Sequence, residues 1–222
     1  MLDSFASFWQ TLATTFANRS AVLGYELLNE PALPQLIDFV ELGLIDRVFL
    51  TPMYRRLHEA IRQVDDKHIL FFEPCVADLL ETGLTEGPGG AEYNNRQVFS
   101  YHVYCLDVTK QGDPKSDLFC EIDDSVLIRS RYLEAKKKKF GGMMLTEFGA
   151  IINTTEGVKE INRITGLADQ YFQSRSDTAA MLATGTRIDQ SNIRSRLVLL
   201  AIQKVSRSHH RGQSSHCRIV LR

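Results

Sequence analysis

Two apolar runs of strand length each end in a glutamate, and this repetition constrains the fold more than any other feature of the sequence. Residues 22–31 are largely apolar until Glu30, and Pro31 then stops the strand because proline cannot donate to a strand ladder. Residues 141–149 are again apolar and carry Glu147 near their end. In a barrel of alternating strands and helices, the active site lies at the C-terminal strand ends. The pattern therefore predicts that two carboxylates, 117 residues apart in the chain, meet at one edge of a shared sheet.

Two opposed carboxyl groups are what cleavage of a glycosidic bond requires. One group must be protonated so that it can donate to the leaving oxygen, and the other must be ionised so that it can attack or stabilise the anomeric carbon. A role in anchoring a loop would explain either glutamate equally well if it occurred alone. Because two strands end in the same way, the sequence favours the catalytic interpretation for Glu30 and Glu147.

Strands and helices alternate along residues 1–172. Apolar residues recur at helical spacing in residues 2–16 and 51–64, and two further strands are predicted at residues 68–74 and 98–105. Near-continuous apolar strands separated by helices are typical of buried parallel sheets. We therefore expect an α/β fold of the barrel type, incomplete because four strands are evident where a closed barrel needs eight. In such an open sheet the strand that ends at Glu30 would have an unpaired edge.

Residues 173–222 differ in composition from the chain before them. They carry eight arginines and one lysine against two aspartates, a balance of +7, although the whole chain has a net charge of -1. They contain no phenylalanine, tyrosine or tryptophan. A folded core needs such bulky side chains, so we expect residues 173–222 to be a divergent basic tail that is disordered or mistranslated.

The composition of the whole chain excludes several classes of function. The net charge of -1 gives no nucleic-acid signature, and no apolar run approaches the roughly 20 residues that cross a bilayer. Residues 1–5 lack the basic and then apolar pattern of a signal peptide, so we expect none in this chain. Cys105 and Cys120 flank a loop and can pair in an oxidising compartment, but base rates favour unpaired buried thiols.

The alternation of side chains along a strand indicates which residues share a face. Glu26 has the same parity as Glu30, and His102 has the same parity as Tyr104. If the strand-end acids face the barrel axis, Glu26 is an interior charge that needs a cationic or hydrogen-bonding partner. The predicted strands offer no evident partner, so we expect Glu26 to be a core residue.

Three short motifs follow one another in register. They are Asn-Glu-Pro at residues 29–31, His-Val-Tyr at residues 102–104 and Thr-Glu-Phe-Gly at residues 146–149. These motifs resemble the acid/base strand, the histidine and tyrosine strand and the nucleophile strand of glycoside hydrolase family 5. Longer stretches are similar to the endoglycoceramidase-related branch of that family, namely residues 22–31, 71–74, 85–94, 100–105 and 111–114.

The resemblance implies a TIM barrel of the (β/α)8 type, of which about strands 4 to 7 are present, and a retaining mechanism. Glu30 would be the general acid/base and Glu147 the nucleophile, with their carboxyl groups about 5 to 5.5 Å apart. No metal or organic cofactor is implied. Four residues are expected to bind substrate, namely Asn29, His102, Tyr104 and Glu73. A purely structural role is the alternative for His102 and for Glu73.

The resemblance covers residues 1–172, which we interpret as a partial catalytic domain of a C-terminal partial sequence. The family's first three strands and its late substrate-stacking tryptophan have no counterpart here. The expected function is hydrolysis of the bond between glycan and ceramide in glycosphingolipids, with a peripheral contact to the lipid. Another family 5 β-glucanase or a glucosylceramidase is the alternative within this chemistry, and an inactive fragment with weak glycan binding is the alternative outside it. The resemblance also implies a secreted or lysosomal location.

Overall fold

The computed structural model describes residues 1–32, 41, 43–76, 78, 81–110, 113–149, 151, 154–175, 198–201 and 220–221. In chain order, the elements are α1 (Leu2–Phe16), β1 (Val22–Glu26), the π-helical turn η1 (Asp46–Leu50), α2 (Thr51–Arg62), β2 (Ile69–Phe72), the 3-10 turn η2 (Ala91–Tyr93), β3 (Gln97–Val103), α3 (Asp117–Lys138), β4 (Gly142–Phe148), α4 (Thr155–Gln170), β5 (Ser174–Arg175), β6 (Val198–Ala201) and β7 (Val220–Leu221).

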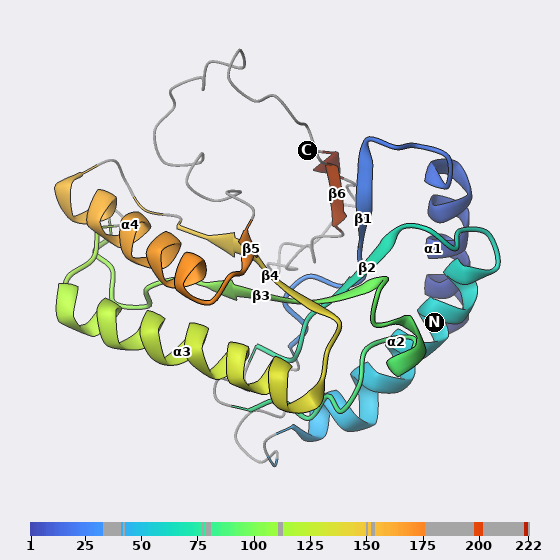
Figure 1. Cartoon of the computed structure of the whole chain (residues 1–222), viewed down its shortest axis with the longest axis horizontal. Coiled ribbons are helices and arrows are strands. Elements are labelled where there is room, and N and C mark those ends of the chain that lie inside the picture. Colours follow the sequence, from blue (N-terminus) through green and yellow to red (C-terminus); the bar gives the residue numbers. More distant parts are fainter. Residues whose placement is uncertain are drawn as a thin grey trace, which may run out of the picture.

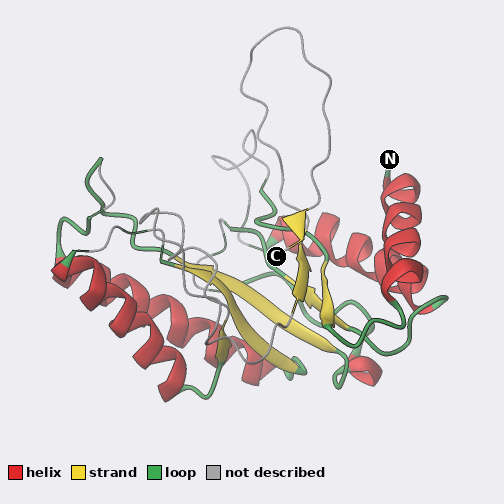
Figure 2. Cartoon of the chain, turned by 90° about the horizontal axis from the view of Figure 1, so that it is seen from above, coloured by secondary structure: helices red, strands yellow, loops and turns green. Residues whose placement is uncertain are grey.

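One curled sheet contains all the strands, in the order β5-β4-β3-β2-β1-β6-β7 (Figure 1). Strands β1 to β6 are parallel to their neighbours, and β7 pairs antiparallel with β6. Helices α2, α3 and α4 connect successive parallel strands, and the helices lie along the outside of the curled sheet (Figures 1 and 2). This arrangement confirms the expected α/β fold of a partial barrel.

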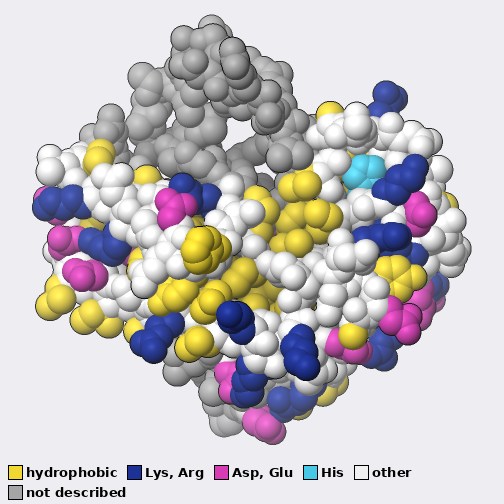
Figure 3. Space-filling view, viewed as in Figure 1, with side chains coloured by type: hydrophobic (Ala, Val, Ile, Leu, Met, Phe, Trp, Pro, Cys, Tyr) yellow, Lys and Arg dark blue, Asp and Glu magenta, His cyan; other side chains and the backbone are white. Residues whose placement is uncertain are grey.

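Two apolar clusters fix the helices to the sheet. Trp9, Tyr25 and Leu57 belong to the cluster that packs α1 and α2 on β1 and β2, and all three are fully buried. Ile128 and Ile164 belong to the second cluster, which packs α3 and α4 on β3 and β4. Burial of this kind is the main favourable contribution to folding. Figure 3 shows further hydrophobic side chains open at the centre of one face, with charged side chains around them.

The ends of the two long helices are determined by local chemistry. The hydroxyl of Ser116 accepts a hydrogen bond from the backbone N–H of Phe119 and so caps the start of α3. Thr154 caps α4 in the same way. At the other end of α3, the lysines of residues 136–138 lie where positive charge suits the helix dipole, as the sequence predicted. Helix α3 then ends at Lys139, which takes the left-handed conformation.

Two predictions about the first strand are wrong. Strand β1 ends at Glu26 and not at Glu30, because the backbone leaves the ladder after Leu27 and Glu30 has a φ of 45°. The predicted unpaired edge of β1 is in fact paired, because β6 lies beside β1 on the side away from β2. The predicted boundary at residue 172 stays a prediction, although β5, β6 and β7 lie beyond it and join the same sheet. No helix in the described ranges is long and apolar enough to cross a bilayer.

Candidate active site

Glu30 and Glu147 meet at the C-terminal end of the parallel strands, as the sequence predicted. Glu147 lies near the end of β4, and Glu30 lies in the segment that follows β1. One carboxylate oxygen of each, together with a ring nitrogen of His102, forms a group of atoms within 4.8 Å of one another. The positive φ of Glu30 is seldom adopted by residues other than glycine, and such backbone strain is concentrated at functional sites.

Tyr104 orients the carboxylate of Glu147. Its hydroxyl donates a hydrogen bond of 2.6 Å to Oε2 of Glu147. Burial, followed by the hydrogen bond to Glu147, raises the pKa of Tyr104 well above its usual value, so the hydroxyl keeps its proton and stays a donor. Glu147 therefore accepts a hydrogen bond that fixes the orientation of its carboxyl group, as the position of a nucleophile requires.

His102 lies between three carboxylates. Its Nδ1 is 2.9 Å from Oε1 of Glu30 and 3.8 Å from Oε2 of Glu147, and its Nε2 is 3.3 Å from Oε1 of Glu73. Burial opposes a charge on the ring, but the hydrogen bonds to Glu30 and Glu73 outweigh it and raise the pKa of His102 to about 11. His102 is thus a cation that links the acid/base candidate to a second carboxylate behind it.

The same contact affects Glu30. The hydrogen bond from His102 lowers the pKa of the Glu30 carboxyl below its usual value, although burial acts in the opposite direction. In the open site Glu30 is therefore in its basic form. A bound glycan would exclude water from Glu30. Loss of the negative charge of Glu147, when this residue bonds to the sugar, would change the charge around Glu30. Both changes determine when Glu30 carries a proton.

The other two predicted substrate-binding residues are differently placed. Asn29 is mostly buried, and its Oδ1 is buried without a hydrogen-bond partner among the described residues, so its contact with substrate stays a prediction. Glu73 directly follows β2 and is only 2% exposed. Its Oε2 accepts a hydrogen bond of 3.2 Å from the backbone N–H of Glu30. Glu73 thus supports Glu30 and His102 from behind, and a direct contact with substrate stays a prediction.

A cavity of about 380 Å³ opens beside these residues. Glu30, Glu73, His102 and Tyr104 line one part of it, and Asp123 and Arg131 add further charged groups to its wall. Its walls continue into apolar side chains on the loop after β3 and on α3, of which Leu106 is 72% and Val126 47% exposed. The site therefore adjoins an apolar surface.

Glu26 is buried in the core, as expected, but the expectation that the strands offer it no partner is wrong, and sequence reasoning missed Tyr54. Glu26 has partners: its carboxyl interacts with Glu73, His102 and the side chain of Thr146. Tyr54, on α2, donates a hydrogen bond of 2.7 Å to the carbonyl of Glu73. The alternation of side chains identified Glu26 as an interior residue, but nothing in the sequence indicated that Tyr54 reaches across to the strand ends.

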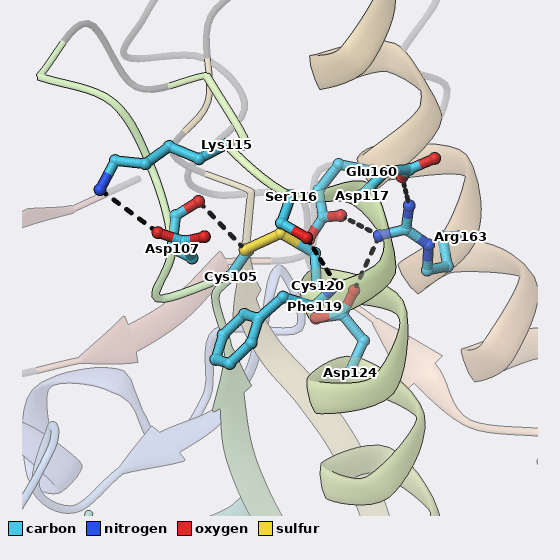
Figure 4. Close-up of a disulfide and its surroundings, with 10 residues drawn as sticks. All are labelled: Cys105, Asp107, Lys115, Ser116, Asp117, Phe119, Cys120, Asp124, Glu160 and Arg163. Atoms are coloured by element: carbon cyan, nitrogen blue, oxygen red, sulfur yellow. Dashed lines mark hydrogen bonds and ion pairs between the residues drawn. A yellow bond between two sulfur atoms is a disulfide. The ribbon is translucent and has the colours of Figure 1, made fainter.

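Cys105 and Cys120 form a disulfide, so the expectation of unpaired thiols is wrong (Figure 4). Cys105 directly follows Tyr104, and Cys120 lies in the first turn of α3, so their Cα atoms are only 5.1 Å apart. The close approach arises because the chain leaves β3 and returns to the start of α3 beside it. The disulfide therefore fixes the segment that carries Tyr104.

An ion cluster beside the disulfide joins α3 to α4 (Figure 4). Arg163 of α4 makes ion pairs with Asp117, Asp124 and Glu160. Asp124 is fully buried, and burial followed by the charge of Glu160 raises its pKa to about 8. A proton shared between two buried carboxyl groups reduces their repulsion.

His102 supplies a positive charge to Glu30, Glu73 and Glu147 through its ion pairs. The expectation that catalysis uses no metal or organic cofactor stays a prediction.

Comparisons with known proteins agree with this geometry. A family model described as Cellulase (glycosyl hydrolase family 5) matches residues 1–181. Two curated proteins named endoglycoceramidase, from Hydra vulgaris and Cyanea nozakii, are 37% and 32% identical over 149 and 177 residues, which are 66% and 78% of this chain. The solved structure of endo-glycoceramidase II from Rhodococcus sp. with a cellobiose-like imidazole is 25% identical, with a TM-score of 0.65, and the match covers 81% of this chain and 40% of that one. The chain spans about a quarter to a third of the curated relatives, 26% and 32% of their lengths.

Proposed function

The chain belongs to glycosyl hydrolase family 5, and from this we propose that it is a retaining glycoside hydrolase with Glu30 as acid/base and Glu147 as nucleophile. The observation that carries the proposal is the separation of the two carboxylates. One oxygen of each lies within 4.8 Å of the other, which supports the close pair of a retaining enzyme over the wider pair of an inverting one.

In the first step, the carboxylate of Glu147 forms a bond to the anomeric carbon while the bond to the leaving oxygen breaks. Glu30, in its protonated form, gives its proton to that oxygen. In the second step Glu30, now ionised, takes a proton from water, and the resulting hydroxide equivalent displaces Glu147 from the sugar. The hydrogen bond from Tyr104 keeps Glu147 aligned for both displacements.

The proposed substrate is a glycan attached to ceramide, with the lipid in peripheral contact with the protein. Two curated relatives carry the name endoglycoceramidase, which supports this class of substrate. The cavity supports it too, because the side chains of Leu106 and Val126 provide an apolar surface beside the carboxylates. Burial of part of a hydrocarbon chain against such a surface is favourable.

We also propose that the protein works in a secreted or lysosomal compartment. The disulfide between Cys105 and Cys120 is of the kind that persists in oxidising surroundings. Asn18 begins the acceptor sequence Asn-Arg-Ser at residues 18–20 and is exposed in the turn before β1, so it is accessible for glycosylation. The test is to treat the natural protein with a glycosidase that removes N-linked glycans. A glycan that is released from the wild type and not from Asn18→Gln supports this location, and a natural protein without any glycan at Asn18 counts against it.

The function is tested by incubating the purified chain with lactosylceramide and with an aryl lactoside. Release of intact lactose from both substrates, lost in Glu147→Gln, supports the proposal. The control is Glu92→Gln, which makes the same substitution on an exposed residue away from the site. Stable, folded wild-type protein that releases no sugar from either substrate would contradict it.

A further inference from the structure

A second group of charged side chains lies one layer beneath the catalytic candidates. Glu26 on β1, Glu73 after β2 and His102 on β3 each bring one polar atom within 4.8 Å of the others. Glu26 and Glu73 are both 2% exposed, so water does not solvate their charges. Glu26 has no role in the proposed reaction. Burial of a carboxyl group costs free energy, so we asked what role Glu26 has.

The contacts of Glu73 show that its carboxyl group faces hydrogen-bond donors. Its Oε2 accepts the backbone N–H of Glu30, and its Oε1 faces Nε2 of His102 at 3.3 Å. Both partners are donors, so Glu73 acts as an acceptor toward each of them. An oxygen of Glu26 lies within 4.8 Å of an oxygen of the same carboxylate. Two buried carboxyl groups this close repel each other unless one of them carries a proton, and Glu73 already faces two donors, which leaves Glu26 to carry it.

We propose that Glu26 is a buried carboxylic acid that holds its proton at neutral pH and donates it to Glu73, which keeps Glu73 an anion and His102 aligned on Glu30. The inference rests on the proposed function, because the alignment of Glu30 matters only if Glu30 is the acid/base. Glu26 is a positioning residue, since it acts through Glu73 and His102 and touches no reacting atom.

The surroundings of Glu26 favour this protonation state. Burial, followed by the negative charge of Glu73, raises the pKa of Glu26 to about 8, and the charge of His102 and the hydrogen bond from Thr146 only partly oppose them. Tyr54, which faces the pair from α2, is neutral because burial and then the charge of Glu73 raise its pKa well above its usual value. Among the described residues these are the titratable and polar groups that interact with Glu26.

The four side chains thus form a chain of contacts, Glu26 to Glu73 to His102 to Glu30. When Glu26 loses its proton, two adjacent anions repel each other and compete for His102. The ring then moves or changes its hydrogen bonds, and Glu30 loses its aligned donor. Activity is therefore expected to fall as the pH rises through the range in which Glu26 ionises.

Infrared spectroscopy tests the protonation directly and without any need for activity. A protonated carboxyl group has a carbonyl band that an ionised one lacks. In the full chain at neutral pH, we expect such a band in wild type and in Glu92→Gln, and its partial loss in Glu26→Gln; Asp124 contributes the part that remains. Spectra of wild type and Glu26→Gln that are identical in this region would overturn the proposal. If Glu26→Gln does not fold, loss of the band in wild type as the pH rises from 7 to 9 decides the question, with Asp124→Asn removing the other contribution.

The pH profile of glycosidase activity tests the consequence. The amide of Glu26→Gln still donates to Glu73 but cannot ionise, so the alkaline limb is expected to shift upward by about one pH unit, and the shift should be absent in Glu92→Gln. A purely structural role for Glu26 would lower activity equally at every pH and leave the limb in place, which would contradict the proposal. If wild type has no activity, the proposed function fails, but the infrared result still decides the state of Glu26.

Discussion

Tyr104→Phe removes a single hydroxyl group and a single hydrogen bond from the proposed nucleophile. The hydroxyl donates to Oε2 of Glu147 at 2.6 Å, and Tyr104 is protonated because burial raises its pKa. The ring itself is kept, so its packing against His102 persists, with ring centroids 6.3 Å apart. The change therefore isolates the contribution of the hydrogen bond to the alignment of Glu147.

The size of the effect follows from the charge on the acceptor. A hydrogen bond to a charged group contributes about 1.5–3 kcal/mol. At about 1.36 kcal/mol for each factor of ten in rate, its loss corresponds to a decrease of roughly 10- to 150-fold in kcat. The value of KM should change less, because the hydroxyl contacts the nucleophile and not the bound sugar.

Steady-state kinetics with an aryl lactoside measures both parameters, and the midpoint of thermal unfolding shows whether the variant is folded. Tyr132→Phe is the matched control, because Tyr132 lies on α3 and stacks on Tyr171, away from the carboxylates. A decrease in kcat of less than threefold, in a folded variant, would refute the orienting role of Tyr104. A loss as large in Tyr132→Phe would show that hydroxyl removal acts through stability.

Three further predictions concern the acid/base residue, the disulfide and the ion cluster. Glu30→Gln should slow hydrolysis of lactosylceramide by at least about 100-fold but spare aryl lactosides with good leaving groups, which need no proton; equal loss on both, measured as kcat/KM, would argue against the role of Glu30. Replacing both Cys105 and Cys120 by serine should lower the free energy of unfolding by about 3 kcal/mol, since the bond closes a loop with a sequence separation of 15; denaturant unfolding that is unchanged would show that the loop is already restrained. Because burial raises the folded-state pKa of Asp124 to about 8, its contribution to stability is present below the unfolded pKa near 4 and is lost as the pH rises through 8; Asp124→Asn should flatten this dependence of the unfolding midpoint, and an unaltered slope would contradict it.

The residues that were predicted to converge, and that the structure brings together, share one property. Glu30, His102, Tyr104 and Glu147 each lie at or just after an apolar run that forms a strand, and parallel strands bring their C-terminal ends to one edge whatever the loops do. Local pattern alone was therefore sufficient to predict that these side chains converge.

The features that the sequence did not show depend on contacts between distant segments. Glu26 pairs in register with Phe71, so Glu73 lies two residues further along β2's path and on the same face, and this contact depends on strand register. The disulfide depends on the path of the chain between β3 and α3, which spacing alone does not specify. The proline at residue 31 revealed neither the early end of β1 at Glu26 nor the positive φ of Glu30.

The central claim, that Glu147 is the nucleophile of a retaining reaction, is tested most directly by trapping the glycosyl-enzyme. A lactoside with fluorine at the carbon next to the anomeric centre and a good leaving group should react with the full chain, because the fluorine slows release of the intermediate more than its formation. Digestion with trypsin releases Glu147 in the peptide of residues 140–159. We predict that mass spectrometry finds one added fluorolactosyl group on Glu147 in this peptide, and none in Glu147→Gln. A sugar attached to Glu30 instead, or hydrolysis of the unmodified lactoside with inverted stereochemistry, would contradict the account.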